Sequence, residues 1–226
     1  MSKTYAIAID GPAAAGKSTI AKRLASALNF VYIDTGAMYR AFTWAVMEHG
    51  LNPEDEKISC SLIGQVSISL EEDGRVICNG TDVTRAIREP RVSSNVSYIA
   101  SYKDIRLALV DMQRDLAQAK SVVMDGRDIG TYVLPNADVK IFQIASVLTR
   151  AKRRQKENEE KGIPTTLEDV IADVEKRDYI DSHRSFAPLS KAEDAIEVDT
   201  SDMTIDEVVA TILKIIEDKT GVRPCR

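Results

Sequence analysis

Residues 5–18 read YAIAIDGPAAAGKS, an apolar run followed directly by the pattern G-x-x-x-x-G-K-S. The apolar run predicts a buried strand, and the residues after it predict a helix with Ile20, Leu24 and Leu28 four positions apart. A glycine-rich turn between a strand and a helix exposes consecutive backbone N–H groups, and the positive end of the helix dipole attracts anions. The stretch therefore predicts an α/β fold with a phosphate loop (residues 11–18) that binds a nucleoside triphosphate.

The phosphate loop and the residue after it supply the predicted contacts to the triphosphate. The Lys17 ammonium can reach the β- and γ-phosphates, and the Ser18 hydroxyl can bind Mg²⁺. A glycine turn without a ligand is the alternative, but the four fixed positions match by chance in only roughly one chain in a hundred of this length. The predicted contacts are Gly11, Pro12, Ala13, Ala14, Ala15, Gly16, Lys17, Ser18 and Thr19.

The composition is that of an ordinary globular chain and excludes several classes of protein. Of the 226 residues, 44% are hydrophobic and 29% charged, and the net charge of −5 argues against nucleic-acid binding by bulk electrostatics. No 18-residue apolar run exists, and residues 1–4 leave no room for a signal peptide before the first strand. We therefore expect a cytoplasmic protein without membrane or nucleic-acid partners. The three cysteines fit neither a disulfide framework nor a zinc site.

Strand and helix patterns alternate along the chain. Strands are predicted at residues 5–9, 30–33, 122–124, 139–144 and 195–198. Residues 107–116 and the segment from Thr204, which opens with the capping box Thr204-x-x-Glu207, have helical spacing of apolar side chains. This alternation predicts a mainly parallel sheet with helices on both faces.

Acidic residues follow four of the five predicted strands. They are Asp10, Asp34, Asp125 and Asp199. Open α/β sheets bind their ligands at the carboxyl ends of the strands, so these positions predict the edge that carries the site. Aspartate also caps helices and forms turns, so one such residue alone indicates little.

Two segments depart from the alternation. Residues 66–83 alternate apolar and polar side chains around two turns, which predicts a small antiparallel meander. Residues 150–164 are almost all charged and hold five cations within seven positions. One interpretation is a solvated helix with pairs such as Arg153–Glu157 and Lys156–Glu160. The other is a cationic lid over phosphates, and the sequence leaves both open.

Three further clusters point to a second ligand. Thr35 is a predicted helix N-cap after the second strand, and Arg40 follows in that helix. Residues 125–130, DGRDIG, place two acids and an arginine after the third strand. The helix from residue 167, with a capping box at Thr165-x-x-Glu168, carries a stripe of Val170, Val174, Arg177, Asp181 and Arg184. A stripe that begins apolar and turns charged predicts a helix that leaves the core for a ligand cleft or, alternatively, for solvent.

Five motifs in this order and spacing closely resemble the bacterial cytidylate kinases (CMP/dCMP kinases), a family of P-loop nucleoside monophosphate kinases. They are GPAAAGKS (11–18), DTGAMYR (34–40), DGRDIGT (125–131), VKIF (139–142) and RDYIDSHR with APL (177–189). The resemblance covers nearly the whole chain. It implies a three-layer α/β fold with a five-stranded parallel sheet. The implied core is residues 1–64, 97–149 and 167–226, with an antiparallel nucleotide-binding insert at 65–96 and a helical lid at 150–166.

The resemblance also implies the reaction and the roles of residues. The γ-phosphoryl group of ATP would pass to CMP or dCMP, with Lys17, Arg127, Arg150, Arg154 and Arg184 as catalytic groups. CMP would be bound by Thr35, Arg40, Ser97, Arg106, Arg127, Asp128, Arg177, Asp181 and Arg184, of which Ser97, Arg106 and Asp128 read the cytosine edge. Arg153 would contact ATP. Ser18 would bind Mg²⁺, with Asp34 or Asp125 acting through water.

Some positions depart from the pattern of the family. Ala14 stands where glycine is frequent, and we expect alanine to fit there only if its φ is negative. Gln143 interrupts an apolar strand, and His183 occupies a variable position. A kinase of the same fold acting on UMP or shikimate is the main alternative, against which the Arg106 and Asp128 pair argues. A GTP-binding switch would need an N-K-x-D motif, which the chain lacks. We expect a monomer.

Overall fold

The fold is described in a computed structural model for residues 3–71, 73–160 and 162–225. The chain forms two compact units. The first contains the residues up to Tyr32 together with those from Lys120 onward, and the second is Ile33–Ala119. The phosphate loop and the predicted lid belong to the first unit, and the predicted nucleotide-binding insert belongs to the second.

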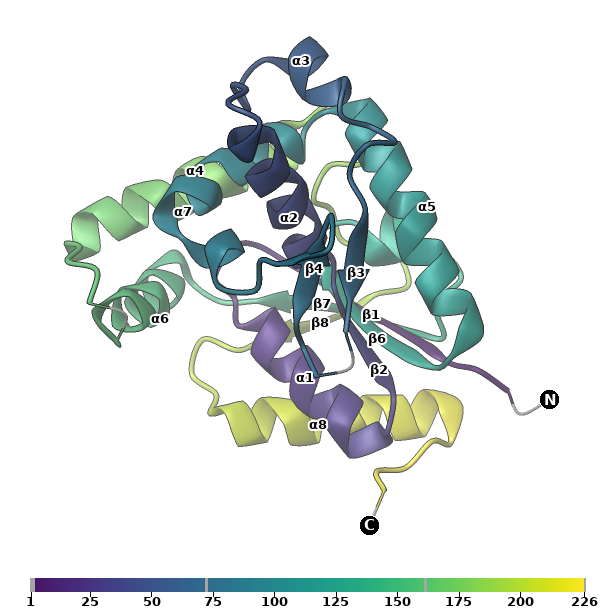
Figure 1. The fold of residues 1–226 in the computed structure, drawn as a ribbon. Helices are drawn as coiled ribbons and strands as arrows, with labels where there is room; N and C mark the ends of the chain where they lie inside the picture. Colours follow the sequence, from purple (N-terminus) through teal and green to yellow (C-terminus); the bar gives the residue numbers. More distant parts are fainter. Residues whose placement is uncertain (1–2, 72, 161, 226) are drawn as a thin grey trace. The chain divides into compact units, whose positions relative to one another are not determined.

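A five-stranded parallel sheet has the order β2-β6-β1-β7-β8 (Figure 1). Its strands are β1 (Ala6–Asp10), β2 (Val31–Asp34), β6 (Val122–Gly126), β7 (Val139–Ile144) and β8 (Ile196–Asp199). In the centre, Ala8 of β1 lies opposite Met124 of β6 and Lys140 of β7, and both pairings are parallel. β1 is apolar up to Asp10 because such a central strand is buried on both faces. All five predicted strands are confirmed, with ends shifted by at most two residues.

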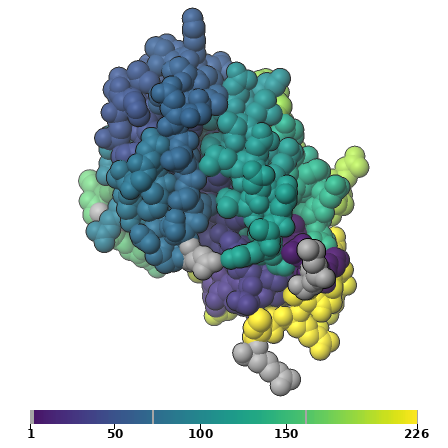
Figure 2. All heavy atoms as spheres, turned by 45° about the vertical axis from the view of Figure 1, so that its right-hand side comes forward, coloured from purple at the N-terminus to yellow at the C-terminus, as the bar shows by residue number. Residues whose placement is uncertain are grey.

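Among the described residues, the α-helices of the first unit are α1 (Lys17–Leu28), α6 (Val147–Glu160), α7 (Leu167–His183) and α8 (Ile205–Thr220). α8 packs beside α1, and Figure 2 shows its atoms (yellow) next to those of α1 (purple). The capping box of Thr204 and Glu207 is formed, as predicted. The box predicted at Thr165 is wrong, because Thr166 is the N-cap and accepts a hydrogen bond from the Asp169 N–H. None of the helices in the described part of the chain is long and apolar enough to cross a membrane.

The second unit combines helices with a small antiparallel sheet. Its elements are α2 (Thr35–Glu48), α3 (Glu56–Cys60), β3 (Ile68–Leu70), β4 (Val76–Cys78), β5 (Thr81–Asp82), a 3₁₀ turn (Ala86–Arg88), α4 (Pro90–Ile99) and α5 (Lys103–Ala119). In the sheet, Ile68 lies opposite Cys78 and Ile77 opposite Asp82. The predicted meander and the helix predicted at residues 107–116 are therefore confirmed.

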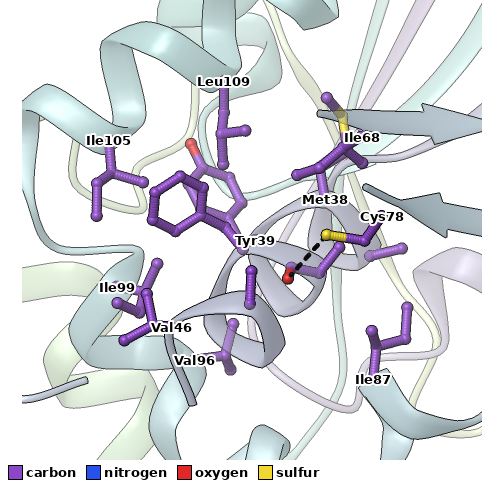
Figure 3. Packing of buried hydrophobic residues seen from close by; sticks show 14 of the residues in the cluster. Met38, Tyr39, Val46, Ile68, Cys78, Ile87, Val96, Ile99, Ile105 and Leu109 are labelled. Carbon is purple, nitrogen blue, oxygen red and sulfur yellow. Dashed lines mark hydrogen bonds between the residues drawn. The ribbon is translucent and has the colours of Figure 1, made fainter. Parts of the chain in front are cut away.

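The core of the second unit joins its sheet to three of its helices (Figure 3). Met38 and Tyr39 of α2 pack with Ile68 and Cys78 of the sheet and with Leu109 of α5. The Cys78 thiol donates a weak hydrogen bond to the Ala41 carbonyl, and burial raises its pKa to about 11. The Cys78 thiol therefore contributes to packing of the core and not to chemistry.

Candidate active site

The phosphate loop contains two residues in left-handed conformations. Ala14 has φ +57° and Gly16 has φ +88°. Left-handed residues alternating with others turn successive N–H groups toward one point, and such a nest binds anions. Gly11 is required for another reason, because a Cβ at this residue would lie 2.0 Å from the Gln143 carbonyl oxygen. The loop therefore has the backbone of a phosphate site.

The expectation that alanine fits at position 14 only with a negative φ is wrong, because Ala14 occupies this position with a positive φ. A left-handed conformation costs an alanine about 1–2 kcal/mol, so the surroundings must hold it there. The methyl group of Ala14 packs against a cluster of Ala151, Val170 and Val174 from α6 and α7. These two helices lie side by side, so Ala14 is anchored to a firm surface. Apolar contact and polar bonds to the loop together offset the strain.

Lys17 is buried and bonded to the phosphate loop itself. Its ammonium donates to the carbonyl oxygens of Gly11 at 2.8 Å and Pro12 at 2.7 Å. Burial lowers its pKa well below the usual range, and the nearby Arg127 acts in the same direction. The Asp125 carboxylate opposes both effects. The Lys17 side chain thus lies in a dry, crowded position, where electrostatic interactions are stronger than in water.

Ser18 and Asp125 form the pair with the chemistry of a magnesium site. The Ser18 hydroxyl donates to Asp125 at 2.9 Å, and the other carboxylate oxygen accepts from the Tyr32 hydroxyl at 2.7 Å. Mg²⁺ is typically bound by one or two protein oxygens together with substrate phosphates and waters. No group of three or more His, Cys, Asp or Glu in the described ranges could hold a metal. A hydroxyl and one carboxylate could hold Mg²⁺ together with substrate phosphates and waters.

Asp34, the second predicted metal residue, is engaged elsewhere in the second unit. It is the N-cap of α2 and accepts from the Ala37 N–H, so the prediction that Thr35 is the N-cap is wrong. The carboxylate also pairs with Arg88 at 3.1 Å and Arg40 at 3.5 Å. Burial alone would raise the pKa of Asp34, but the two arginines lower it below its usual value. These contacts give Asp34 a role in fixing Arg40.

Asp10 connects the end of β1 to the turn that carries Asp128. Its two carboxylate oxygens accept from the N–H groups of Ile129 at 2.8 Å and Gly130 at 2.7 Å. These residues open a π-helical turn (Ile129–Val133), a geometry common at functional sites. A Cβ at Gly130 would lie 3.0 Å from the Lys140 side chain, so a larger residue there would require that side chain to shift. Asp10 thereby fixes the backbone next to Asp128.

A pH-dependent stability follows from the burial of Asp10. Burial raises its pKa from 3.8 to about 6, despite the two N–H bonds. Because the folded pKa is the higher one, the contribution of Asp10 to stability is full below pH 3.8 and is lost as the pH rises through 6. Relative to Asp10→Asn, the wild type should lose up to about 3 kcal/mol between about pH 4 and pH 7. Urea unfolding of both proteins across this range measures the difference, and parallel curves would contradict the assignment.

Arginines and aspartates of the predicted acceptor site meet in the first unit. Arg127 pairs with Asp181 at 2.8 Å, and Arg184 pairs with Asp128 at 3.3 Å. Burial raises the pKa of Asp181, but Arg127, Arg177 and Arg184 outweigh it and lower the pKa below its usual value. Asp181, at the charged end of α7, is buried among these arginines and not in solvent, and the ligand cleft predicted for this end stays a prediction. The guanidinium groups of Arg127 and Arg184 are therefore oriented by the carboxylates with which they pair.

The remaining predicted acceptor residues lie in the second unit. The Arg106 guanidinium is buried, donates to the Ala100 carbonyl at 2.8 Å and lies 5.2 Å from the centre of the Tyr39 ring. Ser97 is buried on α4. Such fixed donors suit recognition of a base edge, because a rigid polar group discriminates between hydrogen-bond patterns.

The three arginines of the predicted lid lie on α6 and have different partners. Arg150 is buried and donates to Ala145, Ala13 and Asp178. Arg153 donates to the carbonyl oxygens of Thr200 at 2.6 Å and Ala15 at 3.3 Å. Arg154 pairs with Glu157 at 3.5 Å. Two of these cations thus contact the phosphate loop and not the glutamates of their own helix; Lys161 of the predicted lid lies outside the described residues.

Comparison with known proteins decides the family. The sequence profile described as "Cytidylate kinase" matches residues 7–218. The chain belongs to the cytidylate kinase family. It is 52% identical over 97% of its length to a protein named cytidylate kinase from Anoxybacillus flavithermus, of which it covers 99%. A protein of the same name from Leuconostoc mesenteroides is 54% identical over 95% of this chain and 97% of its own. The protein is therefore an ATP-dependent nucleoside monophosphate kinase.

A solved structure supports the fold of this cytidylate kinase family member. An uncharacterized protein from Eubacterium ventriosum superposes with a TM-score of 0.53 over 96% of this chain and 99% of its own. Its sequence identity is 16%, so the likeness concerns the fold alone.

Three residues of this cytidylate kinase family member contribute to the site without having been predicted. Asp178 contacts the backbone of Ala13, and Tyr32 contacts Asp125. Gln143 was noticed only as a break in an apolar strand, and its amide donates to the Ala15 carbonyl at 2.6 Å. Gln143 alone left a signal in the sequence, since a polar residue within a buried strand needs a hydrogen-bond partner.

Proposed function

We propose that this member of the cytidylate kinase family transfers the γ-phosphoryl group of ATP to CMP or dCMP, with ATP on the phosphate loop and the acceptor phosphate on the arginine cluster. The observation that carries the proposal is the family match over residues 7–218. The nest around Ala14 and Gly16 and the paired Arg127 support it, because both suit phosphate groups.

The transfer needs positioning and charge, and little covalent help from the protein. The attacking group is a phosphate oxygen that is ionised at neutral pH, so no side chain has to act as a general base. We propose that Lys17 and Arg154 stabilise charge on the transferring group, while Arg127, Arg184 and Arg40 hold the acceptor phosphate. Arg154 is proposed because its side chain is 34% exposed, whereas that of Arg150 is buried. Residues 150–166 stay a predicted lid.

Mg²⁺ is the proposed cofactor, and Ser18 and Asp125 are the residues that would hold it. When bound, it would neutralise charge on the phosphates. Tyr32 fixes the Asp125 carboxylate through its hydroxyl, which prepares the oxygen beside Ser18. The Asp34 carboxylate is engaged by two arginines and the α2 N-terminus, so we give it a positioning role for Arg40.

Base recognition is proposed for Asp128, Arg106 and Ser97. A carboxylate accepts from the exocyclic amine of cytosine, and a guanidinium donates to its ring acceptors. Arg177 and Asp181 would hold the ribose, and Thr35 would contact CMP at the start of α2. UMP presents a carbonyl where cytosine presents an amine, so a carboxylate disfavours it.

A panel of acceptors tests the proposal. ADP release should be fastest with CMP or dCMP and at least tenfold slower, in kcat/KM, with UMP, AMP or shikimate. Asp128→Ala removes the carboxylate that would accept from the exocyclic amine of cytosine. This variant should have a higher KM for CMP and a smaller ratio of kcat/KM for CMP to kcat/KM for UMP. Asp173→Ala, an exposed aspartate of α7, is the control. Fastest turnover on shikimate or UMP would replace the proposed acceptor by one of these alternatives.

The oligomeric state and location belong to the same proposal. We expect a monomer that works on free nucleotides in the cytoplasm. Light scattering of the purified protein at micromolar concentration measures its oligomeric state.

A further inference from the structure

We propose that Asp178 is a positioning residue of the ATP site: with Arg150 it fixes the Ala13 peptide and so keeps Ala14 in its left-handed conformation. The inference rests on the proposed function in taking the phosphate loop as the ATP site. In this proposal, the contacts of α6 and α7 with the phosphate loop stabilise the conformation of the loop.

Both polar atoms of Ala13 are bound by this pair of side chains. The Ala13 N–H donates to one oxygen of Asp178 at 3.1 Å, and the Ala13 carbonyl accepts from Arg150 at 3.0 Å. The same Arg150 nitrogen donates to the other oxygen of Asp178 at 2.6 Å. The Ala13 peptide, Arg150 and Asp178 thus form a closed ring of hydrogen bonds, here called the Ala13 clamp.

The Ala13 clamp is itself held rigidly. Arg150 is buried, and its Nε donates to the Ala145 carbonyl at 2.9 Å. Asp178 lies on α7, which packs against α6. A carboxylate and a guanidinium fixed by packing and by further hydrogen bonds orient what they bind better than mobile side chains do.

The next residue in the chain shows what the clamp has to hold. Ala14 has φ +57°, which alanine adopts only where surrounding contacts over-determine the backbone. The clamp fixes the peptide before Ala14, and Gln143 and Arg153 bind the carbonyl of Ala15 after it. The methyl group of Ala14 packs on Val170 and Val174 of α7. Contacts on both sides therefore keep Ala14 left-handed.

A glycine in place of Ala14 would need less support, because glycine populates left-handed conformations without steric cost. The clamp and Ala14 are therefore coupled. Loss of the clamp should release Ala14 toward negative φ and spoil the nest, whereas the Ala14→Gly variant should retain the nest without the clamp. Asp178 could also affect ATP binding through a long-range effect of its charge on Arg127. Substitution of Ala14 would not alter that effect, so the coupling distinguishes it from positioning of the loop.

The test is a double-mutant cycle of Asp178→Ala and Ala14→Gly, read by direct titration of ATP and by the KM values for ATP and CMP. Asp178→Ala should weaken ATP binding about tenfold, with a smaller change in the KM for CMP. In the Ala14→Gly background the same substitution should weaken ATP binding by about threefold or less. Asp173→Ala on the exposed side of α7 should leave all values unchanged.

Two results would overturn the proposal: unchanged ATP affinity in Asp178→Ala, or an equal loss in both backgrounds. If the alanine variant fails to fold, Asp178→Asn replaces it in the test, because asparagine keeps one oxygen for the Ala13 N–H. This variant should bind ATP about threefold more weakly than the wild type. Titration of ATP does not depend on the acceptor, so failure to phosphorylate CMP would reject the proposed acceptor without touching the clamp. Failure of the wild type to bind ATP would reject both.

Discussion

We expect Lys17→Met to lower kcat by at least about a thousandfold while the protein stays folded. The Lys17 ammonium is the buried cation of the phosphate loop, and loss of a charge-stabilising group in such a site typically costs a factor of about 10² to 10³ or more. Methionine fills a similar volume and removes a charge whose burial is unfavourable. The carbonyl oxygens of Gly11 and Pro12 lose a donor in return. We therefore expect the free energy of unfolding to change by less than about 2 kcal/mol.

The measurement is steady-state ADP release with saturating ATP and CMP, together with urea unfolding. Lys214→Met is the matched control, because Lys214 lies exposed on α8 and pairs only with the neighbouring Asp218 among the contacts described. Its kcat should equal that of the wild type. A loss of less than tenfold in Lys17→Met would show that the ammonium does not act on the transferring group.

We expect Arg127→Ala to lower kcat/KM for CMP by at least about a hundredfold. Arg127 holds Asp181 at 2.8 Å, and the two charges lie beside Lys17. Without the guanidinium the acceptor phosphate loses a fork, and the pKa of Asp181 rises because burial is no longer balanced. The acid limb of the pH–rate profile should therefore move to higher pH. Arg184→Ala should lose activity to a similar degree, since Arg184 is the partner of Asp128.

Arg127→Lys separates charge from geometry, because lysine keeps the charge without the planar fork. It should recover part of the rate and restore the position of the acid limb. Arg23→Ala, which removes an exposed ion pair with Asp206 at 2.5 Å, is the control. Near-normal rates in both Arg127→Ala and Arg184→Ala would reject the assigned acceptor cluster.

The strands and most helices were predictable because their patterns are local. The apolar run before Asp10 indicates a strand that is buried on both faces. The alternation of apolar and polar residues in 66–83 indicates strands with one buried and one exposed face. Helix starts were less predictable. Asp34 and Thr35 are both good caps, as are Thr165 and Thr166, and the chain direction after the preceding segment decides between them.

The partners of the α6 arginines could not be read from the sequence. Arg153–Glu157 was one of the two interpretations that the sequence left open, whereas Arg153 contacts Ala15 and Thr200. Intrahelical ion pairs are worth only a few tenths of a kcal/mol, so a buried backbone carbonyl of the phosphate loop competes well for the same cation.

The sequence by itself determined the phosphate loop, the alternating fold and the family, because spacing within short motifs carries them. Only the tertiary structure decided the conformation of Ala14 and the contacts of Asp10 and Asp178. The Ala13 N–H finds its acceptor 165 positions later in the chain, and its carbonyl finds Arg150 137 positions later. A backbone angle set by contacts at such separations leaves no local pattern, since the strain at Ala14 is offset by side chains that only folding brings to the loop.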